Sequence, residues 1–238
     1  MNENIYLALD FPTWQETKAF IDRNDFHGVP VKVGMELFYR EGPHLIDALK
    51  QRGHDVLLDL KLHDIPTTVM KAMRNIATLG ADMVTVHALG GSDMIQRAKE
   101  GLTAGTPAGC ETKLIAVTIL TSMDEMIVNR ELKMNGDLQQ NALHFADMAH
   151  QNGADGVVCS VYEAGKIKHL CSPSCLTVTP GIRLHHAAAA DQKRIATPAL
   201  ARNNGADILV VGRTVTHAGN PITAFENVRK EWAHGIKS

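Results

Sequence analysis

The stretch Gly80-Ala81-Asp82-Met83-Val84 recurs as Gly153-Ala154-Asp155-Gly156-Val157 and again as Gly205-Ala206-Asp207-Ile208-Leu209. Each copy joins the end of a helical pattern to a short apolar run that is typical of a strand. A glycine just past a helix end adopts a positive φ at low cost, which suits a tight helix-to-strand turn. Three copies at corresponding points indicate one strand–helix unit that is used repeatedly.

Short apolar, β-branched runs continue this pattern along all 238 residues. They predict eight strands, at residues 5–10, 29–34, 55–62, 83–88, 113–120, 156–160, 176–179 and 208–212. Consecutive strands are far enough apart for one helix and two short loops, as parallel connections require. Eight such units predict the α/β class and a single (β/α)₈ TIM barrel over residues 1–238, with a doubly wound open sheet as the alternative.

Two local features follow from this arrangement. Over residues 65–79 the apolar positions have helical spacing, and we expect Asp64 to be the N-cap with Pro66 in the first turn. We expect only one oversized connection, which follows the fifth strand, from Thr121 to about Asn135. A loop of this length beside a barrel mouth is a candidate lid.

Composition excludes several classes of function. The chain has 24 Lys and Arg against 26 Asp and Glu, a formal charge of −2, and only 5% aromatic residues. A nucleic-acid-binding protein needs a basic face or a stacking surface, so no nucleic-acid partner is expected. Without a membrane-spanning apolar run or a basic, signal-like start, we expect no membrane association and a cytoplasmic location.

Cysteine and histidine give no clear site. The four cysteines fit no disulfide framework in a chain of this size. Cys171, Cys175 and nearby His169 could be imagined around a metal, but their spacing fits no common zinc pattern. The His185-His186 pair falls in a predicted loop, where a solvated role is the better interpretation.

Polar residues gather where the predicted strands end, which is the face on which barrel enzymes carry their chemistry. They are Asp10, Lys32, Asp59, Lys61, His87, Thr121, Arg183, Gly212 and Arg213. A barrel selected only for stability would have no reason to place so many charges at this face. Together they predict an active site.

The third strand is the most informative. Its even-numbered residues from 56 to 62 are apolar, so Asp59 and Lys61 project together to the opposite side, into the barrel mouth. A purely structural ion pair is the alternative, although burying such a pair is seldom a gain in stability. Asp64 follows in the loop. Carboxylates around an ammonium favour its charged form, so we expect Lys61 to be a proton donor.

The last two strands indicate a phosphate site. Barrels often bind phosphate with the loops after strands seven and eight. These loops contain Thr179-Pro180-Gly181-Ile182-Arg183 and Val211-Gly212-Arg213-Thr214. Glycine lets backbone N–H groups approach an anion, and arginine supplies a bidentate fork.

These motifs carry a family resemblance. Asp59-Leu60-Lys61-Leu62-His63-Asp64-Ile65-Pro66-Thr67-Thr68 resembles the Asp-x-Lys-x-x-Asp-Ile-Pro-x-Thr signature of the bacterial orotidine 5′-monophosphate (OMP) decarboxylases. Asp-x-Lys-x-x-Asp alone is shared with ketogulonate-phosphate decarboxylases and hexulose-phosphate synthases. The Ile-Pro-x-Thr extension and the segment Pro180-Gly181-Ile182-Arg183 are specific to the OMP enzymes. The likeness extends from Leu7-Ala8-Leu9-Asp10 to Val210-Val211-Gly212-Arg213.

The resemblance implies a lyase of pyrimidine biosynthesis that converts OMP to UMP and CO₂ without a metal or organic cofactor. Lys61 would protonate C6 of the pyrimidine, within a charge array of Lys32, Asp59, Lys61 and Asp64. Asp10 and Lys32 would hold the ribose, Thr121 the pyrimidine, and Arg183, Gly212 and Arg213 the phosphate, with Gln192 bridging phosphate and base. Asp64, Ile65 and Thr68 would come from the partner subunit of a homodimer with shared active sites.

Two other functions stay open from the residues alone. A metal-dependent relative could act on a sugar phosphate through Mg²⁺ held by Asp10 and Asp59, although Lys61 competes for the same position. Activity that survives EDTA would exclude it. A barrel that only binds phosphate, as a sensor or scaffold, is the second alternative, and a turnover assay separates it from an enzyme.

Overall fold

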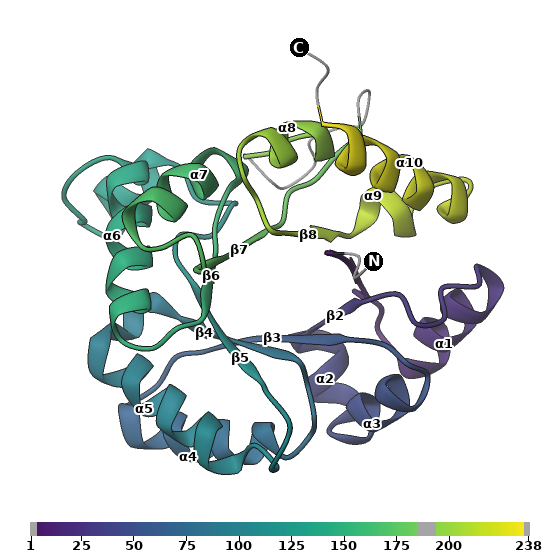
Figure 1. Ribbon diagram of the computed structural model, residues 1–238, viewed down its shortest axis with the longest axis horizontal. Coiled ribbons are helices and arrows are strands. Elements are labelled where there is room, and N and C mark those ends of the chain that lie inside the picture. The colour runs from purple at the N-terminus through teal and green to yellow at the C-terminus, as the bar shows by residue number, and fades with distance from the viewer. Residues whose placement is uncertain (1–3, 185–193, 236–238) are drawn as a thin grey trace.

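The eight predicted strands close into a barrel in the computed structural model, which describes residues 4–184 and 194–235 (Figure 1). Every strand runs parallel to its neighbours, and β1 closes the barrel by pairing with β8, with Ile5 opposite Leu209. The prediction of a (β/α)₈ barrel is confirmed, and the open-sheet alternative is wrong. The strands are β1 (Ile5–Ala8), β2 (Val31–Gly34), β3 (Val56–Leu62), β4 (Met83–His87), β5 (Lys113–Val117), β6 (Gly156–Val158), β7 (Leu176–Thr179) and β8 (Ile208–Val211).

Helices surround the barrel (Figure 1). They are α1 (Trp14–Arg23), α2 (Met35–Glu41), α3 (His44–Gln51), α4 (Pro66–Ala77), α5 (Gly91–Gly105), α6 (Leu138–Gln151), α7 (Val161–Leu170), α8 (Pro198–Asn203), α9 (Arg213–Thr216) and α10 (Pro221–His234), with short turns η1 (Ala88–Gly90) and η2 (Ile127–Glu131). Among the described residues, no helix combines the length and the apolar character that crossing a membrane requires.

The start of α4 differs from the prediction. Ile65, not Asp64, is the N-cap residue, and Pro66 is the first helical residue. Proline suits this position because it has no N–H to leave unpaired there. Asp64 lies one residue further out and accepts the Ile65 N–H on Oδ1 at 2.7 Å. The expectation that Asp64 caps the helix is therefore wrong.

The three Gly-Ala-Asp turns have the predicted glycine geometry. Gly80, Gly153 and Gly205 have φ values of 72°, 97° and 77°. The aspartates have a role that the sequence did not reveal. Asp82 accepts the backbone N–H of Val56, at the start of the preceding strand, on Oδ2 at 2.7 Å.

Asp155 and Asp207 repeat this contact at the next two turns. Their Oδ2 atoms accept the N–H groups of Leu114 at 2.7 Å and Thr177 at 2.8 Å. Lysines from the surrounding helices pair with all three carboxylates: Lys50 with Asp82, Lys99 with Asp155 and Lys168 with Asp207, at 2.6 to 2.7 Å. The amino-terminal rim of the barrel is thus held together by one contact used three times.

The core has two main layers. The larger lies between strands and helices and contains the outward residues of β3, Val56, Leu58 and Leu60, all at most 5% exposed. The smaller fills the barrel interior, with Tyr6, Leu57, Met83, Ile115, Val178 and Ile208. The predicted alternation along β3 is confirmed here, since Leu57 faces inward and its neighbours face the helices. This inner layer forms the floor beneath the polar residues of the mouth.

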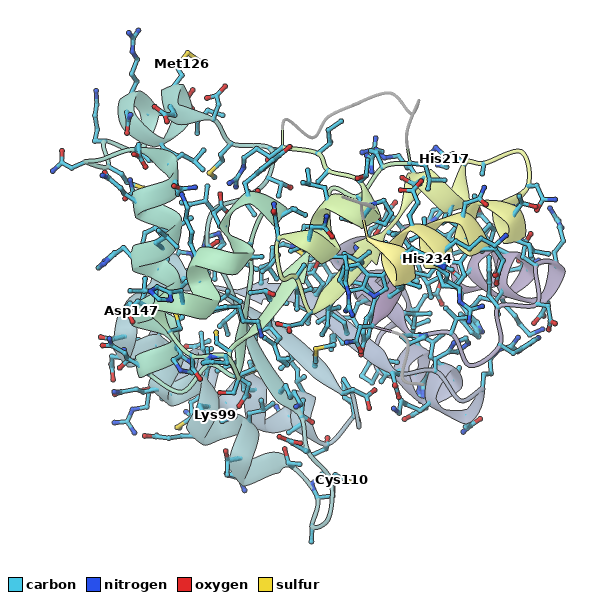
Figure 2. The ribbon with its side chains drawn as sticks, turned by 45° about the horizontal axis from the view of Figure 1, so that its top comes forward. Lys99, Cys110, Met126, Asp147, His217 and His234 are labelled. Atoms are coloured by element: carbon cyan, nitrogen blue, oxygen red, sulfur yellow. The ribbon has the colours of Figure 1, made fainter. Side chains whose placement is uncertain are left out.

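Five of the eight strands end one to three residues before the predicted boundary, at Ala8, His87, Val117, Val158 and Val211. The connection after β5 encloses a small apolar cluster of Ile119, Val128, Leu138 and Ala142. Figure 2 shows Met126 on this connection and Cys110 on the loop that leads into β5, at opposite ends of the molecule. This connection is not the only long one. The chain also runs from Thr179 to Pro198 between β7 and α8.

Candidate active site

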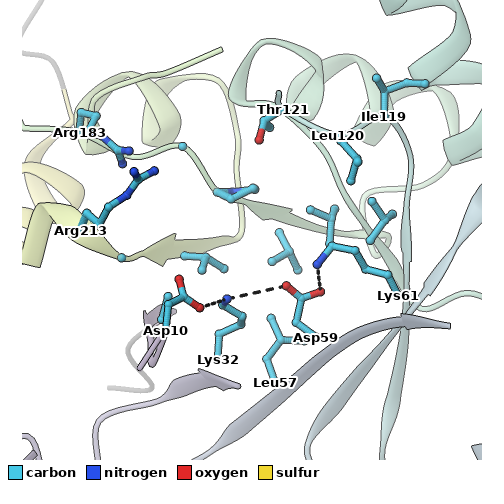
Figure 3. Close-up of a pocket in the computed structure, with 18 residues that line it drawn as sticks. Asp10, Lys32, Leu57, Asp59, Lys61, Ile119, Leu120, Thr121, Arg183 and Arg213 are labelled. Atoms are coloured by element: carbon cyan, nitrogen blue, oxygen red, sulfur yellow. Dashed lines mark hydrogen bonds and ion pairs between the residues drawn. The ribbon is translucent and has the colours of Figure 1, made fainter. Parts of the chain in front are cut away.

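A cavity of about 240 Å³ opens at the carboxyl ends of the strands (Figure 3). Eight predicted site residues line it: Asp10, Lys32, Asp59, Lys61, Thr121, Arg183, Gly212 and Arg213. The remaining walls are mainly apolar, formed by Leu57, Val117, Ile119, Leu120, Val158, Val178, Pro180 and Val210. A concave apolar site with a few converging polar groups is the usual form of a small-molecule site.

Four charged side chains form an alternating array along one side of the cavity. Lys32 Nζ lies 2.7 Å from Asp10 Oδ1 and 4.0 Å from Asp59 Oδ2. Lys61 Nζ lies 2.8 Å from Asp59 Oδ1. The side chains of Lys32 and Asp59 are only 12% and 17% exposed, while that of Asp10 is 60% exposed. The array therefore runs from solvent into the depth of the cavity, where its inner charges are shielded from water.

Lys61 has an unusual backbone. Its φ is 51°, in the left-handed region that residues other than glycine seldom occupy. The pairing of β3 with β4 shifts register in the same place, between Leu58 and Leu62. Such bulges are common beside active sites, where they redirect a side chain. Strict alternation correctly predicts the side of the strand for Lys61 but misses this distortion.

The two arginines lie on the other side of the cavity from Lys61 (Figure 3). Arg183 is only 8% exposed and donates to its own neighbour, the Ile182 carbonyl, at 2.9 Å. Gly181, two residues before Arg183, has a φ of 81°, a backbone conformation that favours glycine. At Gly212, an added Cβ would lie 3.5 Å from Ala8 Cβ and 3.7 Å from the Asp10 carboxylate. This side of the cavity offers two guanidinium groups and two lining glycines, Gly181 and Gly212, across the cavity from Lys61.

Three predicted site residues within the described part of the chain, all near the start of α4, do not line this cavity. Asp64, Ile65 and Thr68 are exposed at the start of α4, and the Ile65 side chain is 67% exposed. Gln192 lies outside the described residues, as does the His185-His186 pair. Within one chain, the charge array therefore consists of Asp10, Lys32, Asp59 and Lys61, without Asp64.

His87, at the end of β4, is a buried titratable group next to the array. Burial lowers its pKa to about 4, and the nearby His63 and Lys61 act in the same direction. Its Nδ1 accepts the Leu89 N–H at 3.3 Å, and its ring stacks on that of His63 at 5.7 Å between centroids. His87 is therefore neutral at pH 7. It does not line the cavity.

Three residues that contact the site were not predicted. Thr85 on β4 contacts both Asp59 and Lys61. Arg194 pairs with Glu163, which is 2% exposed, and donates to the Ile119 and Leu120 carbonyls at 3.2 and 3.4 Å. Burial raises the pKa of Glu163, and Arg194 opposes that shift. The Arg194–Glu163 pair thus holds the segment that follows β5, directly before Thr121.

The cysteines lie away from the cavity. All four are free thiols, with Cys159 and Cys175 buried and Cys110 exposed. Burial raises the pKa of Cys171 to about 12, so its thiol is protonated and unreactive at neutral pH. In the described part of the chain, no three potential ligand side chains gather in a way that would hold a metal ion.

The model of the orotidine 5′-phosphate decarboxylase / HUMPS family matches residues 3–228. The chain belongs to this family. It is 51% identical to the orotidine 5′-phosphate decarboxylase of Bacillus pumilus (strain SAFR-032), over 95% of this chain and 97% of that protein. It is 50% identical to that of Bacillus caldolyticus, over 99% and 97% of the two chains.

Solved structures agree with this family membership. The crystal structure of orotidine 5′-phosphate decarboxylase from Lactobacillus acidophilus superposes with a TM-score of 0.86 at 42% identity, covering 98% of this chain and 99% of that one. An uncharacterized conserved protein from Geobacillus kaustophilus superposes with a TM-score of 0.84 at 45% identity, covering 96% and 99%. The resemblance seen in the sequence motifs is confirmed over nearly the full chain.

Proposed function

We propose that this member of the OMP decarboxylase family converts orotidine 5′-monophosphate to UMP and CO₂, with Lys61 delivering the proton to C6 of the pyrimidine. The alternating array of Asp10, Lys32, Asp59 and Lys61 carries the proposal. It places an ammonium and a shielded carboxylate next to each other in a cavity whose other side holds two arginines.

The array suits a decarboxylation at an sp² carbon. Loss of CO₂ leaves an electron pair on C6 with no adjacent electron sink. The Lys61 ammonium, held 2.8 Å from Asp59, stabilises this developing negative charge and then supplies the proton. Asp59 has the same charge as the substrate carboxylate, so the repulsion between them falls as CO₂ leaves. Lys61 ends the step as a neutral amine and regains its proton from solvent.

The remaining cavity residues divide between the parts of the nucleotide. Asp10, at the exposed end of the array, and Lys32, which pairs with it, bind the ribose hydroxyls. Arg183, Arg213 and the backbone at Gly212 bind the 5′-phosphate, since bidentate guanidinium groups match phosphate oxygens. Phosphate contacts remote from C6 supply binding energy for positioning the reacting carbon.

Two further residues complete the substrate contacts. Thr121, which follows β5 and lines the cavity, hydrogen-bonds the pyrimidine. The family resemblance assigns Gln192, which lies outside the described residues, to a contact with the phosphate and the base. The proposed reaction uses no metal or organic cofactor, because the ammonium and carboxylates of the chain provide the charges that it needs. We place it in the cytoplasm, as a step in UMP biosynthesis.

The active site is shared between the two subunits of a homodimer. Asp64, Ile65 and Thr68 are exposed beyond the end of β3 and do not line their own cavity, which makes them available to a partner. In a two-fold interface the same surface is used by both subunits. Each cavity would therefore combine Lys61 of one chain with the partner's Asp64.

Exposed apolar residues support an interface at this place. Met35, Tyr39, Ile65 and Leu89 are 44%, 67%, 67% and 38% exposed. They lie after β2, β3 and β4, on neighbouring segments at the mouth of the barrel. Large apolar side chains that gather on one rim are typical of a protein–protein contact.

Replacement of Lys61 tests the proposed role directly. Lys61→Ala should abolish measurable turnover of OMP, followed by its loss of absorbance, while UMP still binds through its phosphate and ribose. Lys18→Ala, which removes an exposed lysine on α1, is the matched control and should keep full activity. Substantial turnover by a verified Lys61→Ala preparation would remove Lys61 from the proton-transfer step.

A further inference from the structure

We propose that Thr85 is a positioning residue for the decarboxylation, because its hydroxyl holds both Asp59 and the backbone of Lys61 in place. This inference rests on the proposed role of Lys61 and Asp59. Thr85 lies on β4, is 0% exposed and does not line the cavity. It acts through the two charged residues and does not touch the substrate.

The first observation is the bulge in β3. Leu58 is opposite Val84, and the next aligned pair is Leu62 opposite Val86. Three residues of β3, from 59 to 61, therefore face the single residue Thr85. Lys61 absorbs the excess length in its left-handed conformation, with φ of 51°. The ordinary ladder partner of the Lys61 N–H is lost at such a bulge.

The second observation is the hydrogen-bond acceptor of the Lys61 N–H. The Lys61 N–H donates to Thr85 Oγ1 at 2.8 Å. The Thr85 hydroxyl in turn donates to Asp59 Oδ1 at 3.0 Å. The same Asp59 oxygen accepts from Lys61 Nζ at 2.8 Å. One hydroxyl thus connects the strained backbone of the lysine with the carboxylate that its own ammonium contacts.

The two hydrogen bonds of the Thr85 hydroxyl depend on each other. Because Thr85 Oγ1 receives the Lys61 N–H, its own hydrogen is directed to Asp59. Without the hydroxyl, a buried N–H in a strained backbone would have no acceptor, and Asp59 would lose one of its donors. The bulge would relax, and the ammonium would move relative to C6. Displacement of a catalytic group by about 1 Å lowers rates by up to roughly 100-fold.

The proposed experiment compares Thr85→Val with two other variants. Valine keeps the shape of threonine and removes only the hydroxyl. Thr85→Val should lower kcat by about 10- to 100-fold, with the KM for OMP and the Kd for UMP changed by no more than a few-fold. Thr85→Ser, which keeps the hydroxyl, should restore most of kcat. Activity is expressed per UMP-binding site, so that a misfolded fraction does not count.

Thr177→Val is the matched control. Thr177 is also 0% exposed on a barrel strand, donates to a carboxylate oxygen of Asp207 at 3.0 Å and accepts a backbone N–H, that of Asp207, at 3.1 Å. It lies at the start of β7, at the amino-terminal rim and away from the cavity. Its replacement should lower the thermal stability about as much as Thr85→Val while leaving kcat unchanged.

The outcomes separate this inference from the proposed function. The inference is overturned if Thr85→Val keeps kcat within about twofold of wild type, if Thr85→Ser loses as much as Thr85→Val, or if Thr177→Val loses as much kcat. In each of these cases an inactive Lys61→Ala would leave the proposed function standing. An active Lys61→Ala enzyme would instead refute the proposed function, whatever the result for Thr85.

Discussion

Protonation of His87 should make the protein lose stability in mild acid. Its side chain is buried at the end of β4, and burial lowers its pKa from 6.5 to about 4. In the unfolded chain this histidine takes up a proton near pH 6.5, whereas in the folded protein it stays neutral until about pH 4. The unfolded state therefore binds more protons in this window, and stability falls as the pH falls through it.

The size of this stability loss follows from the pKa shift of His87. A shift of one pKa unit corresponds to about 1.4 kcal/mol, so the full shift amounts to about 3 kcal/mol. Acidification from about pH 7.5 to about pH 5 covers only part of the range between the two pKa values. Over this step His87 should lower the free energy of unfolding by about 2 kcal/mol. Positively charged Lys61 and neighbouring His63 add to the penalty of charging His87, although burial is the largest cause.

His87→Asn isolates this contribution. Asparagine does not titrate, and its side-chain oxygen can accept the Leu89 N–H that His87 Nδ1 accepts at 3.3 Å. We expect the variant to be less stable at neutral pH because packing is lost, but to lose about 2 kcal/mol less than wild type on acidification. Urea unfolding at both pH values, without ligand and at one protein concentration, measures the difference.

Two other histidines serve as references for the acid dependence of stability. Burial also lowers the pKa of His54, so wild type and His87→Asn share that part of the acid dependence. His217→Asn, at an exposed position, should follow the wild-type curve. If His87→Asn and wild type lose the same free energy of unfolding between the two pH values, then His87 is not held neutral by its surroundings and the reasoning fails.

Two further predictions concern the phosphate contacts and the packing of α4. Arg213→Ala should weaken binding of UMP by about 1.5–3 kcal/mol, the value of a charged hydrogen bond, while binding of uridine changes little. Equal losses for both ligands in calorimetry would contradict a phosphate contact. Gly101→Ala should lower the free energy of unfolding by about 1–3 kcal/mol, because an added Cβ would lie 2.0 Å from the Met70 carbonyl oxygen of α4. Gly219→Ala, with open space around it, is the control, and equal stability of the two variants would contradict the close contact.

The fold could be predicted because its signals are local. Each strand is a short apolar run, and the glycine turns before β4, β6 and β8 occur where a positive φ is needed. The residues lining the cavity could be predicted for a related reason, since the carboxyl ends of parallel strands meet at one face. Asp10, Lys32, Asp59 and Lys61 are such residues, and their contacts follow from strand order.

The unpredicted features depend on contacts between distant residues. Thr85 is 24 residues from Lys61 in sequence, and the Lys61 N–H meets the Thr85 hydroxyl at a bulge that shifts the β3–β4 register after Leu58. Neither periodicity nor strand order encodes that shift. The Glu163–Arg194 pair likewise joins the start of α7 to the segment before α8. A buried pair of this kind is recognisable only after the barrel has brought the two segments together.

The predicted N-cap of α4 was wrong for a more local reason. Asp64 precedes the helical pattern and has the side chain of a typical N-cap, but Pro66 fixes the first helical residue and so makes Ile65 the cap. Asp64 is thereby left outside the helix, exposed and not among the residues that line its own cavity. This displacement is compatible with a role across a subunit interface.

We propose above that each active site combines Lys61 of one chain with the partner's Asp64. The most direct test mixes inactive Lys61→Ala with inactive Asp64→Asn under conditions that exchange subunits. Each mixed dimer would contain one site with both changes and one site with neither, so random equal mixing should restore about a quarter of wild-type activity per site. If Asp64 serves its own chain, every site keeps one change. In that case no activity would return, although mass spectrometry showed that mixed dimers had formed.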